Sequence, residues 1–512
     1  MNINNINTLG ELKASGYAPQ TIKEEIRKNL IKKLHGKEET FPGILGYEDS
    51  VIPDVERAIL SRHNMLFLGL RGQAKTRMAR QMLHLLDEYI PIVAGSEVND
   101  DPFAPISKYA RDIIAQQGDE TPITWVHRTE RYGEKLATPD VSVADLIGDI
   151  DPIKAANMRL SFADEQVIHY GIIPRSNRCI FVINELPDLQ ARIQVALFNI
   201  LEEGDIQIRG FKLRMPLDVL FVFTANPEDY TNRGSIVTPL KDRIQSQILT
   251  HYPRTIETAL NITEQEAHIL PEQLKAVSMS DMVKRLIEQV AFEARGSEWV
   301  DKKSGVSARL TISAAENAIS AAERRAIINN EKHTQVWIAD LAGIIPSITG
   351  KIELVYEGEQ EGPLQVALNL LNQSIRSLFI NYFPNPEKLK KRRNTGKASM
   401  QEQKEDDNPY KAVVNWFDKG NTVTLIADQK DESKIHELYR VNGLHALVKQ
   451  FFKNANEKEA ALLMEFVLHG LAAFSLISKS VIENKVEFRD LMGSMLNLGT
   501  GSSSSVGDDE EF

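Results

Sequence analysis

The stretch Met65-Leu66-Phe67-Leu68, followed by Gly69-Leu70-Arg71-Gly72-Gln73-Ala74-Lys75-Thr76, decides the fold of this chain. A short apolar run leads into a glycine-bearing loop, and helical periodicity begins near Lys75. The loop fits the phosphate-binding pattern G-x-x-x-x-G-K-[ST] at every position except one, because Ala74 stands where the second glycine is expected. This order of strand, loop and helix predicts the beginning of an α/β domain.

The residue types of the loop predict ATP and Mg²⁺ as ligands. Backbone N–H groups and the positive end of the following helix surround anionic phosphates. Lys75 is expected to reach the β- and γ-phosphates, and Thr76 to ligate Mg²⁺. Because alanine is compatible with the start of a helix, Ala74 is expected to leave binding intact. A plain turn before a helix is the alternative for the loop taken alone. The other predicted nucleotide-binding residues of this segment are Gly69, Arg71, Gly72, Gln73 and Arg77.

A second apolar run, Cys179–Ile183, is followed by two polar residues, Asn184 and Glu185. Ligand sites in open α/β sheets lie at the carboxyl ends of strands, which is where this pair falls. Glu185 is placed to polarise the attacking water. Asn184 can accept a hydrogen bond from a water on Mg²⁺, but it stands where a Walker B aspartate is usual and brings no negative charge. The pattern therefore predicts slow or partner-stimulated hydrolysis.

A third apolar run, Val219–Thr224, leads to Asn226, and a further strand candidate is Ile123–His127. Asn226 fits a polar sensor of the attacking water or the γ-phosphate, whereas a turn-forming Asn-Pro pair is the alternative. Runs of nearly continuous apolar residues are typical of parallel strands covered on both faces. We therefore expect a parallel sheet with helices on both sides.

The totals exclude several classes of protein. A chain of 512 residues is long enough for two or three domains. Its net charge of -11 gives no sign of direct nucleic-acid binding. The single cysteine, Cys179, permits no intrachain disulfide and is expected to be a small core residue. Residues 1–17 do not resemble a secretory signal, and Leu462–Ile477 predicts a buried helix rather than a membrane span, so a cytoplasmic protein is expected.

Composition and periodicity divide the chain into six predicted parts. Lys390, Lys391, Arg392 and Arg393 begin a polar stretch that we interpret as a solvated linker, with a patch for an acidic partner as the alternative. The parts are an N-terminal helical extension (1–36), an α/β nucleotide-binding core (37–254), a helical lid (255–350), an extension with the charged linker (351–407), a mainly helical C-terminal domain (408–500) and a disordered acidic tail (501–512).

With its three strands in this order, the sequence resembles the AAA+ ATPases, and specifically the branch of magnesium chelatase subunit I and the MoxR proteins. The resemblance covers roughly residues 41–326. It implies a P-loop NTPase core of the AAA+ type, followed by an α-helical lid. Further segments that resemble this branch are Ile44–Tyr47, Asn99–Phe103, Phe162–Glu165 with Gly171–Ile173 (the helix-2 insert), the hairpin-like Leu201–Gly210, and Thr224–Glu228, which fits T-x-N-P-E.

The resemblance also implies roles for residues outside the three strands. Leu240–Ile244 is similar to the family's L-x-D-R-F element, which implies that Arg243 is an arginine finger directed at a neighbouring subunit. Arg233 and Arg254 are the competing candidates, and a surface arginine is the plain alternative. Arg309 resembles the second sensor, and Gly46 and Tyr47 are implied to contact nucleotide.

The resemblance implies a homo-oligomeric ring, expected to be a hexamer, that acts on another protein. The chain contains no D-x-S-x-S metal-adhesion motif, so a partner with a von Willebrand A domain is expected to be a separate chain. Three functions stay open: a motor that remodels such a partner, the ATPase subunit of a true magnesium chelatase, and a slow-turnover nucleotide-dependent scaffold. A bacterial enhancer-dependent transcription activator is disfavoured, because the G-A-F-T-G-A loop and a helix-turn-helix are absent from the sequence.

Overall fold

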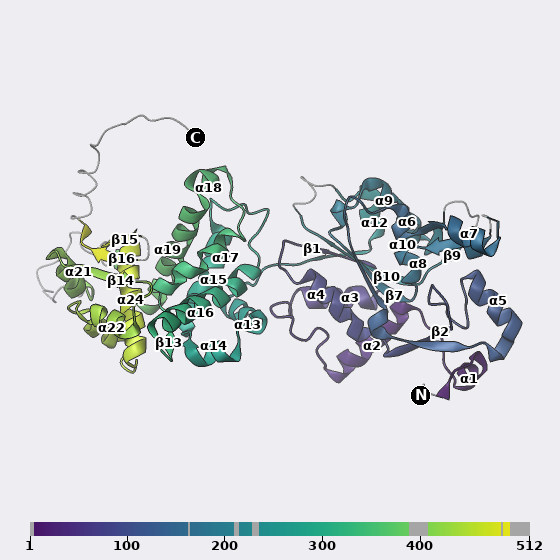
Figure 1. Ribbon diagram of the computed structural model, residues 1–512, viewed down its shortest axis with the longest axis horizontal. Helices are drawn as coiled ribbons and strands as arrows, with labels where there is room; N and C mark the ends of the chain where they lie inside the picture. Colours follow the sequence, from purple (N-terminus) through teal and green to yellow (C-terminus); the bar gives the residue numbers. More distant parts are fainter. Residues whose placement is uncertain are drawn as a thin grey trace, which may run out of the picture. The chain divides into compact units, whose positions relative to one another are not determined.

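A computed structural model of the chain describes residues 5–161, 164–208, 214–227, 235–388, 408–482 and 485–491. It divides into two compact units, Met1–Tyr252 and Pro253–Phe512, which we call unit 1 and unit 2 (Figure 1). The six-part division drawn from the sequence stays a prediction. Several sequence predictions fall outside the described residues, namely those for Phe162, Ala163, Arg209, Gly210, Glu228, Arg233, Lys390–Arg393 and the tail 501–512.

Unit 1 is built on a five-stranded sheet in the order β11-β1-β10-β7-β4. Each neighbouring pair is parallel, with registers such as Met65 opposite Val222 and Val219 opposite Cys179. The strands are β1 (Met65–Leu68), β4 (Tyr132–Leu136), β7 (Cys179–Asn184), β10 (Val219–Ala225) and β11 (Ser246–Leu249). The phosphate-binding loop follows β1 directly and leads into α4 (Lys75–Gln81). This arrangement confirms the predicted α/β fold with a parallel sheet.

Both faces of the sheet are buried. Successive side chains of a strand point to opposite faces, so Ile180 and Val182 join one core cluster while Phe181 and Ile183 join another. Figure 1 shows α3 and α4 on one side of the strands and α9 and α12 on the other. The first side is covered by α2 (Ile22–Gly36), α3 (Val51–Leu60) and α4, and the second by α9 (Ala191–Ala196), α10 (Phe198–Glu202) and α12 (Thr238–Arg243).

The strand predicted at Ile123–His127 exists, but it lies outside the central sheet. It forms β3, which pairs antiparallel with β2 (Tyr89–Val93) in a separate two-stranded sheet. Only Ile123 and Val126 of β3 are buried and Thr124 is exposed, whereas β7 and β10 are buried at every position. The expectation that this run joins the parallel sheet was therefore wrong, because a partly exposed strand does not need a helix on each face.

The helix α2 is tied to the sheet by a buried ion pair. Arg131 donates from Nη1 and Nη2 to the two carboxylate oxygens of Glu25 at 2.7 and 2.6 Å. Its Nε donates to the backbone oxygen of Arg178 at 3.0 Å. The two side chains are only 1% and 2% exposed. The N-terminal helical segment is thus part of the core of unit 1.

The remaining elements of unit 1 are short and surround the sheet. The hairpin-like segment Leu201–Gly210 contains only β8, which pairs antiparallel with β9 beyond the segment, and its first residues belong to α10. These elements are α1 (Leu9–Ala14), η2 (Met82–Leu85), α5 (Lys108–Gln117), η3 (Gly118–Glu120), η4 (Arg128–Glu130), α6 (Val143–Leu146), β5 (Gly148–Ile150), α7 (Pro152–Met158), η5 (Glu165–Val167), β6 (Ile168–Tyr170), α8 (Ile172–Arg175), η6 (Leu186–Asp188), β8 (Asp205–Gln207) and β9 (Arg214–Pro216).

Unit 2 is mainly helical, as the sequence predicted. It adds a small sheet in the order β14-β16-β15 and a two-stranded pair, β12 with β13. Its elements are α13 (Ile256–Glu266), α14 (Pro271–Ala276), β12 (Val277–Ser278), α15 (Asp281–Gly296), α16 (Arg309–Asn329), β13 (Thr334–Gln335), η7 (Ala339–Ile344), α17 (Ile345–Thr349), α18 (Tyr356–Glu361), α19 (Pro363–Tyr382), α21 (Lys411–Asp418), β14 (Val423–Ile426), α22 (Asp431–Tyr439), α23 (Leu444–Phe451), α24 (Glu457–Ala473), β15 (Ser478–Ile482) and β16 (Lys485–Arg489).

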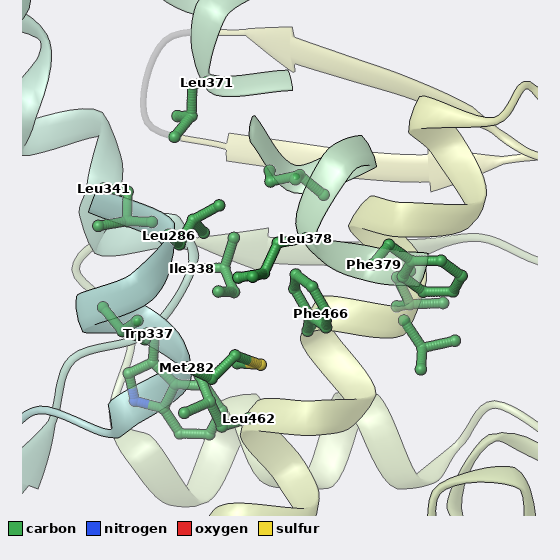
Figure 2. Close-up of a cluster of buried hydrophobic side chains, with 14 of the residues drawn as sticks. Met282, Leu286, Trp337, Ile338, Leu341, Leu371, Leu378, Phe379, Leu462 and Phe466 are labelled. Atoms are coloured by element: carbon green, nitrogen blue, oxygen red, sulfur yellow. The ribbon is translucent and has the colours of Figure 1, made fainter. Parts of the chain in front are cut away.

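One continuous hydrophobic cluster runs through unit 2. It joins side chains of α15 and α16 to those of α19 and α24, and Figure 2 shows Leu286, Leu378 and Phe466 meeting within it. The helix α24 is buried nearly all round, which confirms the prediction of a buried helix over much of Leu462–Ile477. Within the described residues, no helix has both the length and the apolar character needed to span a membrane.

Candidate functional site

The phosphate-binding loop is braced by the segment that follows β11. Thr250 donates from Oγ1 to the side-chain oxygen of Gln73 at 2.6 Å. The buried Tyr47 hydroxyl lies 3.0 Å from the backbone oxygen of Gln73 and 2.8 Å from that of His251. Burial raises the pKa of Tyr47 to about 12, so this hydroxyl stays a neutral donor. The resemblance implied a nucleotide contact for Tyr47, which stays a prediction, and the two bonds of its hydroxyl brace the loop.

Gly69 and Gly72 are two positions of the loop that favour glycine. A Cβ at Gly69 would lie 1.9 Å from the hydroxyl oxygen of Thr250, so only glycine fits there without a shift. Tyr252 donates from its hydroxyl to the backbone oxygen of Arg71 at 2.9 Å. Gly72 has a φ of 71°, which glycine adopts without strain. The loop is therefore held by hydrogen bonds at Arg71 and at Gln73.

Ala74 is not in a helical conformation. Its φ is 56° and its ψ is 15°, in the left-handed region, although the helix begins at the next residue. The expectation that Ala74 would fit as the start of a helix was wrong in this respect. The loop turns sharply before α4, and that turn requires a positive φ, which is why glycine is usual here. A non-glycine residue in this region is disfavoured by about 1–2 kcal/mol.

Lys75, Asn226 and Glu185 form one hydrogen-bonded chain. Lys75 donates from Nζ to the side-chain oxygen of Asn226 at 2.7 Å, and to the backbone oxygens of Gly69 and Leu70. The amide nitrogen of Asn226 donates to Glu185 Oε2 at 2.8 Å. The structure thus brings together the predicted lysine, which begins α4, the predicted sensor, which follows β10, and the predicted base, which follows β7.

A second chain of hydrogen bonds starts at Thr76. Its hydroxyl lies 3.4 Å from the side-chain oxygen of Asn184, and the same oxygen accepts from Thr224 Oγ1 at 3.1 Å. The amide nitrogen of Asn184 donates to Glu134 Oε1 at 2.6 Å. The two residues predicted to hold the metal, Thr76 and Asn184, are therefore neighbours, and a carboxylate from β4 lies directly behind them.

Glu134 is a residue of the site that the sequence reasoning missed. Arg80 on α4 binds it through two bonds, from Nε at 2.9 Å and from Nη2 at 3.1 Å, and the Tyr132 hydroxyl adds a third at 3.2 Å. Partial burial acts to raise the pKa of Glu134, but the bonds and charge of Arg80 outweigh it, and the pKa lies below its ordinary value. Glu134 is therefore ionised at neutral pH. Its strand reads Tyr-Gly-Glu-Lys-Leu, which lacks the apolar run that marks the other strands.

Four other predicted site residues lie on α12, at the start of α16, before α3 and on α4. Arg243 ends α12 and is bound to Glu202, with Nε 2.7 Å from Oε2, and it lies over the ring of Phe198. Arg309 is exposed at the start of α16, in unit 2. Gly46 has a φ of 81° and donates to Glu48 at 3.0 Å. Arg77 lies half-buried on α4. The roles of these four residues stay predictions.

The donor and acceptor set fits ATP with Mg²⁺ better than a metal site made of protein ligands alone. Lys75 is 7% exposed and lies at the head of α4, where backbone N–H groups favour anions. Mg²⁺ is commonly held by one or two protein groups together with phosphate oxygens and water. Among the described residues, no cluster of three or more His, Cys, Asp and Glu side chains could hold a metal ion. Thr76, with Asn184 behind it, is the group that would ligate Mg²⁺.

Comparison with known proteins gives little beyond this geometry. No protein-family model matches the sequence, and no curated protein matches it. Among solved structures, a protein from Cytophaga hutchinsonii provisionally described as an ATPase is 18% identical, with 70% of this chain and 97% of that chain covered and a TM-score of 0.29. The complex of the magnesium chelatase subunits BchI and BchD is 18% identical over 63% of this chain and 98% of that chain, with a TM-score of 0.33.

A third similar structure is NtrX from Brucella abortus in complex with ATP. It is 14% identical, with 70% of this chain and 67% of that chain covered and a TM-score of 0.33. Identities and TM-scores of this size carry no argument about activity or partners. The fold class of the chain is a parallel α/β sheet, with the loop Gly69–Thr76 after β1 and polar side chains at the ends of β7 and β10.

Proposed function

We propose that this chain is an ATP-hydrolysing AAA+ motor of the type of magnesium chelatase subunit I and the MoxR proteins. The observation that carries the proposal is the pair of hydrogen bonds that connects Lys75 to Glu185 through Asn226. It joins the cation expected to bind phosphate, on α4, to the carboxylate expected to activate water, after β7, through a polar residue that follows β10. A plain turn before a helix would not require side chains from α4 and from the ends of β7 and β10 to converge in this way.

Each of these residues has a definite task in the hydrolysis of ATP. Lys75 binds the β- and γ-phosphates, exchanging bonds to backbone oxygens for bonds to phosphate oxygens. Glu185 accepts a proton as the water oxygen bonds to the γ-phosphorus and the bond to the β,γ-bridging oxygen breaks. Asn226 orients the carboxylate of Glu185. Mg²⁺, held by Thr76, would offset the charge on the transferred phosphoryl group.

The assembly and the partner are also part of the proposal, and they rest on the sequence resemblance. Arg243, half-buried at the end of α12, would act as the arginine finger in the site of a neighbouring subunit of a cytoplasmic hexameric ring. Arg309 would act as the second sensor. The ring would remodel or activate a separate protein with a von Willebrand A domain, with the C-terminal helices as the adaptor and without direct contact to nucleic acid.

A pair of substitutions tests the ATPase assignment. We expect Lys75→Ala to abolish ATP binding, and Glu185→Gln to retain ATP binding while phosphate release falls by at least about 100-fold, as for a general base. The measurements are equilibrium binding of a fluorescent ATP analogue and a phosphate-release assay on the full chain. Equal phosphate release from wild-type and Glu185→Gln protein would remove Glu185 from the role of base.

A slow-turnover scaffold is the second candidate, and two observations favour it. Asn184 stands in place of the usual acid, and Ala74 has a strained backbone. Measurement of both ATP affinity and phosphate release separates the two candidates. A scaffold binds ATP but releases no phosphate, even when partner proteins are present.

The ATPase subunit of a true magnesium chelatase stays as a further alternative, because the tetrapyrrole would be held by a different subunit. Incubation of the chain with ATP, Mg²⁺, a porphyrin and candidate partner subunits tests it directly. Metallation of the porphyrin that depends on Lys75 would favour the chelatase over the remodelling motor.

A further inference from the structure

The carboxylate of Glu134 lies one hydrogen bond away from the residue that replaces the usual acid of the site. Asn184 ends β7, and its amide nitrogen is 2.6 Å from Glu134 Oε1 on the neighbouring strand β4. In the register of the two strands, Glu134 pairs with Val182, two residues before Asn184. Residues two apart on a strand point to the same face, so both polar side chains reach the face that carries α4.

The contact fixes the orientation of the Asn184 amide. An ionised carboxylate can only accept hydrogen bonds, so the NH₂ group of Asn184 must face Glu134. The amide oxygen then faces the hydroxyls of Thr76 and Thr224. Because Glu134 binds the NH₂ group, the oxygen of Asn184 is the atom that lies beside Thr76, the residue expected to ligate Mg²⁺.

Arg80 fixes Glu134 in turn. It lies four residues after Thr76 on α4, and residues at this spacing share one face of a helix. Its two bonds to Glu134 hold both carboxylate oxygens, one of which also accepts from Asn184. Two-pronged arginine pairs of this kind define the plane of a carboxylate. The helix that carries Thr76 thus also positions the charge behind Asn184.

The geometry points to Glu134 as a positioning residue that supplies, through Asn184, the negative charge an acid at position 184 would bring to the Mg²⁺ site. This inference rests on the proposed function and deepens it. The charge sits in the second layer around the metal, where partners of ligands commonly change metal affinity by about 10–100-fold. Asn184, on β7, would then supply the oxygen near Mg²⁺, and Glu134, on β4, would supply the negative charge.

The test measures how much Mg²⁺ strengthens ADP binding to the full chain. Affinity for a fluorescent ADP analogue is determined with excess EDTA and with excess MgCl₂. For Glu134→Gln, which keeps an acceptor for Asn184 but loses the charge, we expect unchanged affinity in EDTA and a gain from Mg²⁺ that is about 10-fold smaller than in the wild type. Mn²⁺ binding to the ADP complex, followed by electron paramagnetic resonance, should weaken by the same factor.

Glu165→Gln is the matched control. Glu165 is also paired with an arginine, Arg111 at 2.7 Å, and its side chain is 24% exposed against 23% for Glu134. It belongs to neither chain of the site, so its variant should behave as the wild type. The charge-transposed variant E134Q/N184D should recover the gain from Mg²⁺, and the unchanged ADP affinity of Glu134→Gln protein in EDTA shows that the single variant is folded.

The outcomes separate this inference from the proposed function. A wild-type chain that binds no ADP overturns both. If Mg²⁺ raises the ADP affinity of the wild type and of Glu134→Gln protein by the same factor, the inference alone is overturned. A Glu134→Gln chain that loses equal affinity in EDTA and in MgCl₂ overturns it as well, since the role of Glu134 would then be structural.

Discussion

Ala74 and Glu185, which stand at the two critical turns of the site, share an uncommon backbone conformation. Their φ angles are 56° and 54°, both in the left-handed region. Residues held there cluster at functional sites, because the surrounding structure must compensate for the cost. Glu185 is held by a bond from its own N–H to Thr224 Oγ1 at 3.1 Å, which connects its backbone to the neighbouring strand.

The strain at Ala74 can be measured by substitution. We expect Ala74→Val to lower the free energy of unfolding by about 1–2 kcal/mol, because a β-branched residue tolerates a positive φ poorly. Ala74→Gly should stay within about 1 kcal/mol of the wild type, since relief of strain and the greater freedom of the unfolded chain oppose each other. Urea unfolding gives both values. Ala191→Val, at the exposed first position of α9, is the control, and an equal loss there would contradict the account.

A buried carboxyl in unit 2 predicts how stability changes with pH. Burial raises the pKa of Glu288 to about 7, although Thr263 donates to it at 2.6 Å. The folded state therefore holds a proton that the unfolded state releases, and this contribution grows as the pH falls from about 8 to about 5. Glu288→Gln should lose this part of the pH dependence and be more stable near pH 8 by up to about 3 kcal/mol.

Urea unfolding at several pH values, followed by a signal from unit 2, provides that measurement. Glu465, whose pKa burial also raises to about 7, should leave part of the slope in the variant. Curves for wild-type and Glu288→Gln protein that run parallel across this range would show that Glu288 is not the titrating group.

Side chains of the site were more predictable from sequence than its backbone. Sequence motifs identify Lys75, Glu185 and Asn226. Because parallel strands bring their carboxyl ends to one edge of the sheet, these side chains are expected to lie close together. The left-handed turn at Ala74 was not predicted, because helix propensity describes a residue and not the turn it must make. Glu134 could not be found in this way, since its contact with Asn184 depends on the pairing of two strands far apart in the sequence.

At the scale of elements, α2 depends on one buried charge pair. We expect Glu25→Ala to lower the free energy of unfolding by about 3–5 kcal/mol, because it leaves the guanidinium of Arg131 buried without its partner. Lys32→Ala, at an exposed position of the same helix, should change it by less than about 0.5 kcal/mol. Chemical unfolding of unit 1 provides the comparison. A similar small effect for both variants would show that water reaches Arg131.

Prediction of elements was accurate for the inner strands of the sheet and poor for its edges. The strands β1, β7 and β10 follow the predicted apolar runs closely. The strands β4 and β11 were missed, and they are the two outer strands of the five. Outer strands have one neighbour and can carry polar residues, so they lack the apolar run that marks β7 and β10.

At the scale of the whole molecule, the continuous core of unit 2 predicts independent folding. We expect residues 253–512, produced alone, to unfold cooperatively, because one hydrophobic cluster joins their helices from α15 to α24. Circular dichroism and denaturant unfolding of this fragment provide the measurement. The matched fragment 1–252 serves for comparison, as it contains the whole parallel sheet. A fragment 253–512 with helical content but no cooperative transition would contradict the prediction.

The bonds that brace the phosphate-binding loop also have a mechanical meaning. Thr250, His251 and Tyr252, the last residues of unit 1, are each bonded to the loop or to the Tyr47 hydroxyl that holds it. The covalent chain leaves for unit 2 at the very next residue. A force applied to the chain from unit 2 would therefore act on the loop through residues 250–252 alone. A change in the loop would displace the same three residues, so that force and phosphate binding would act on one short segment.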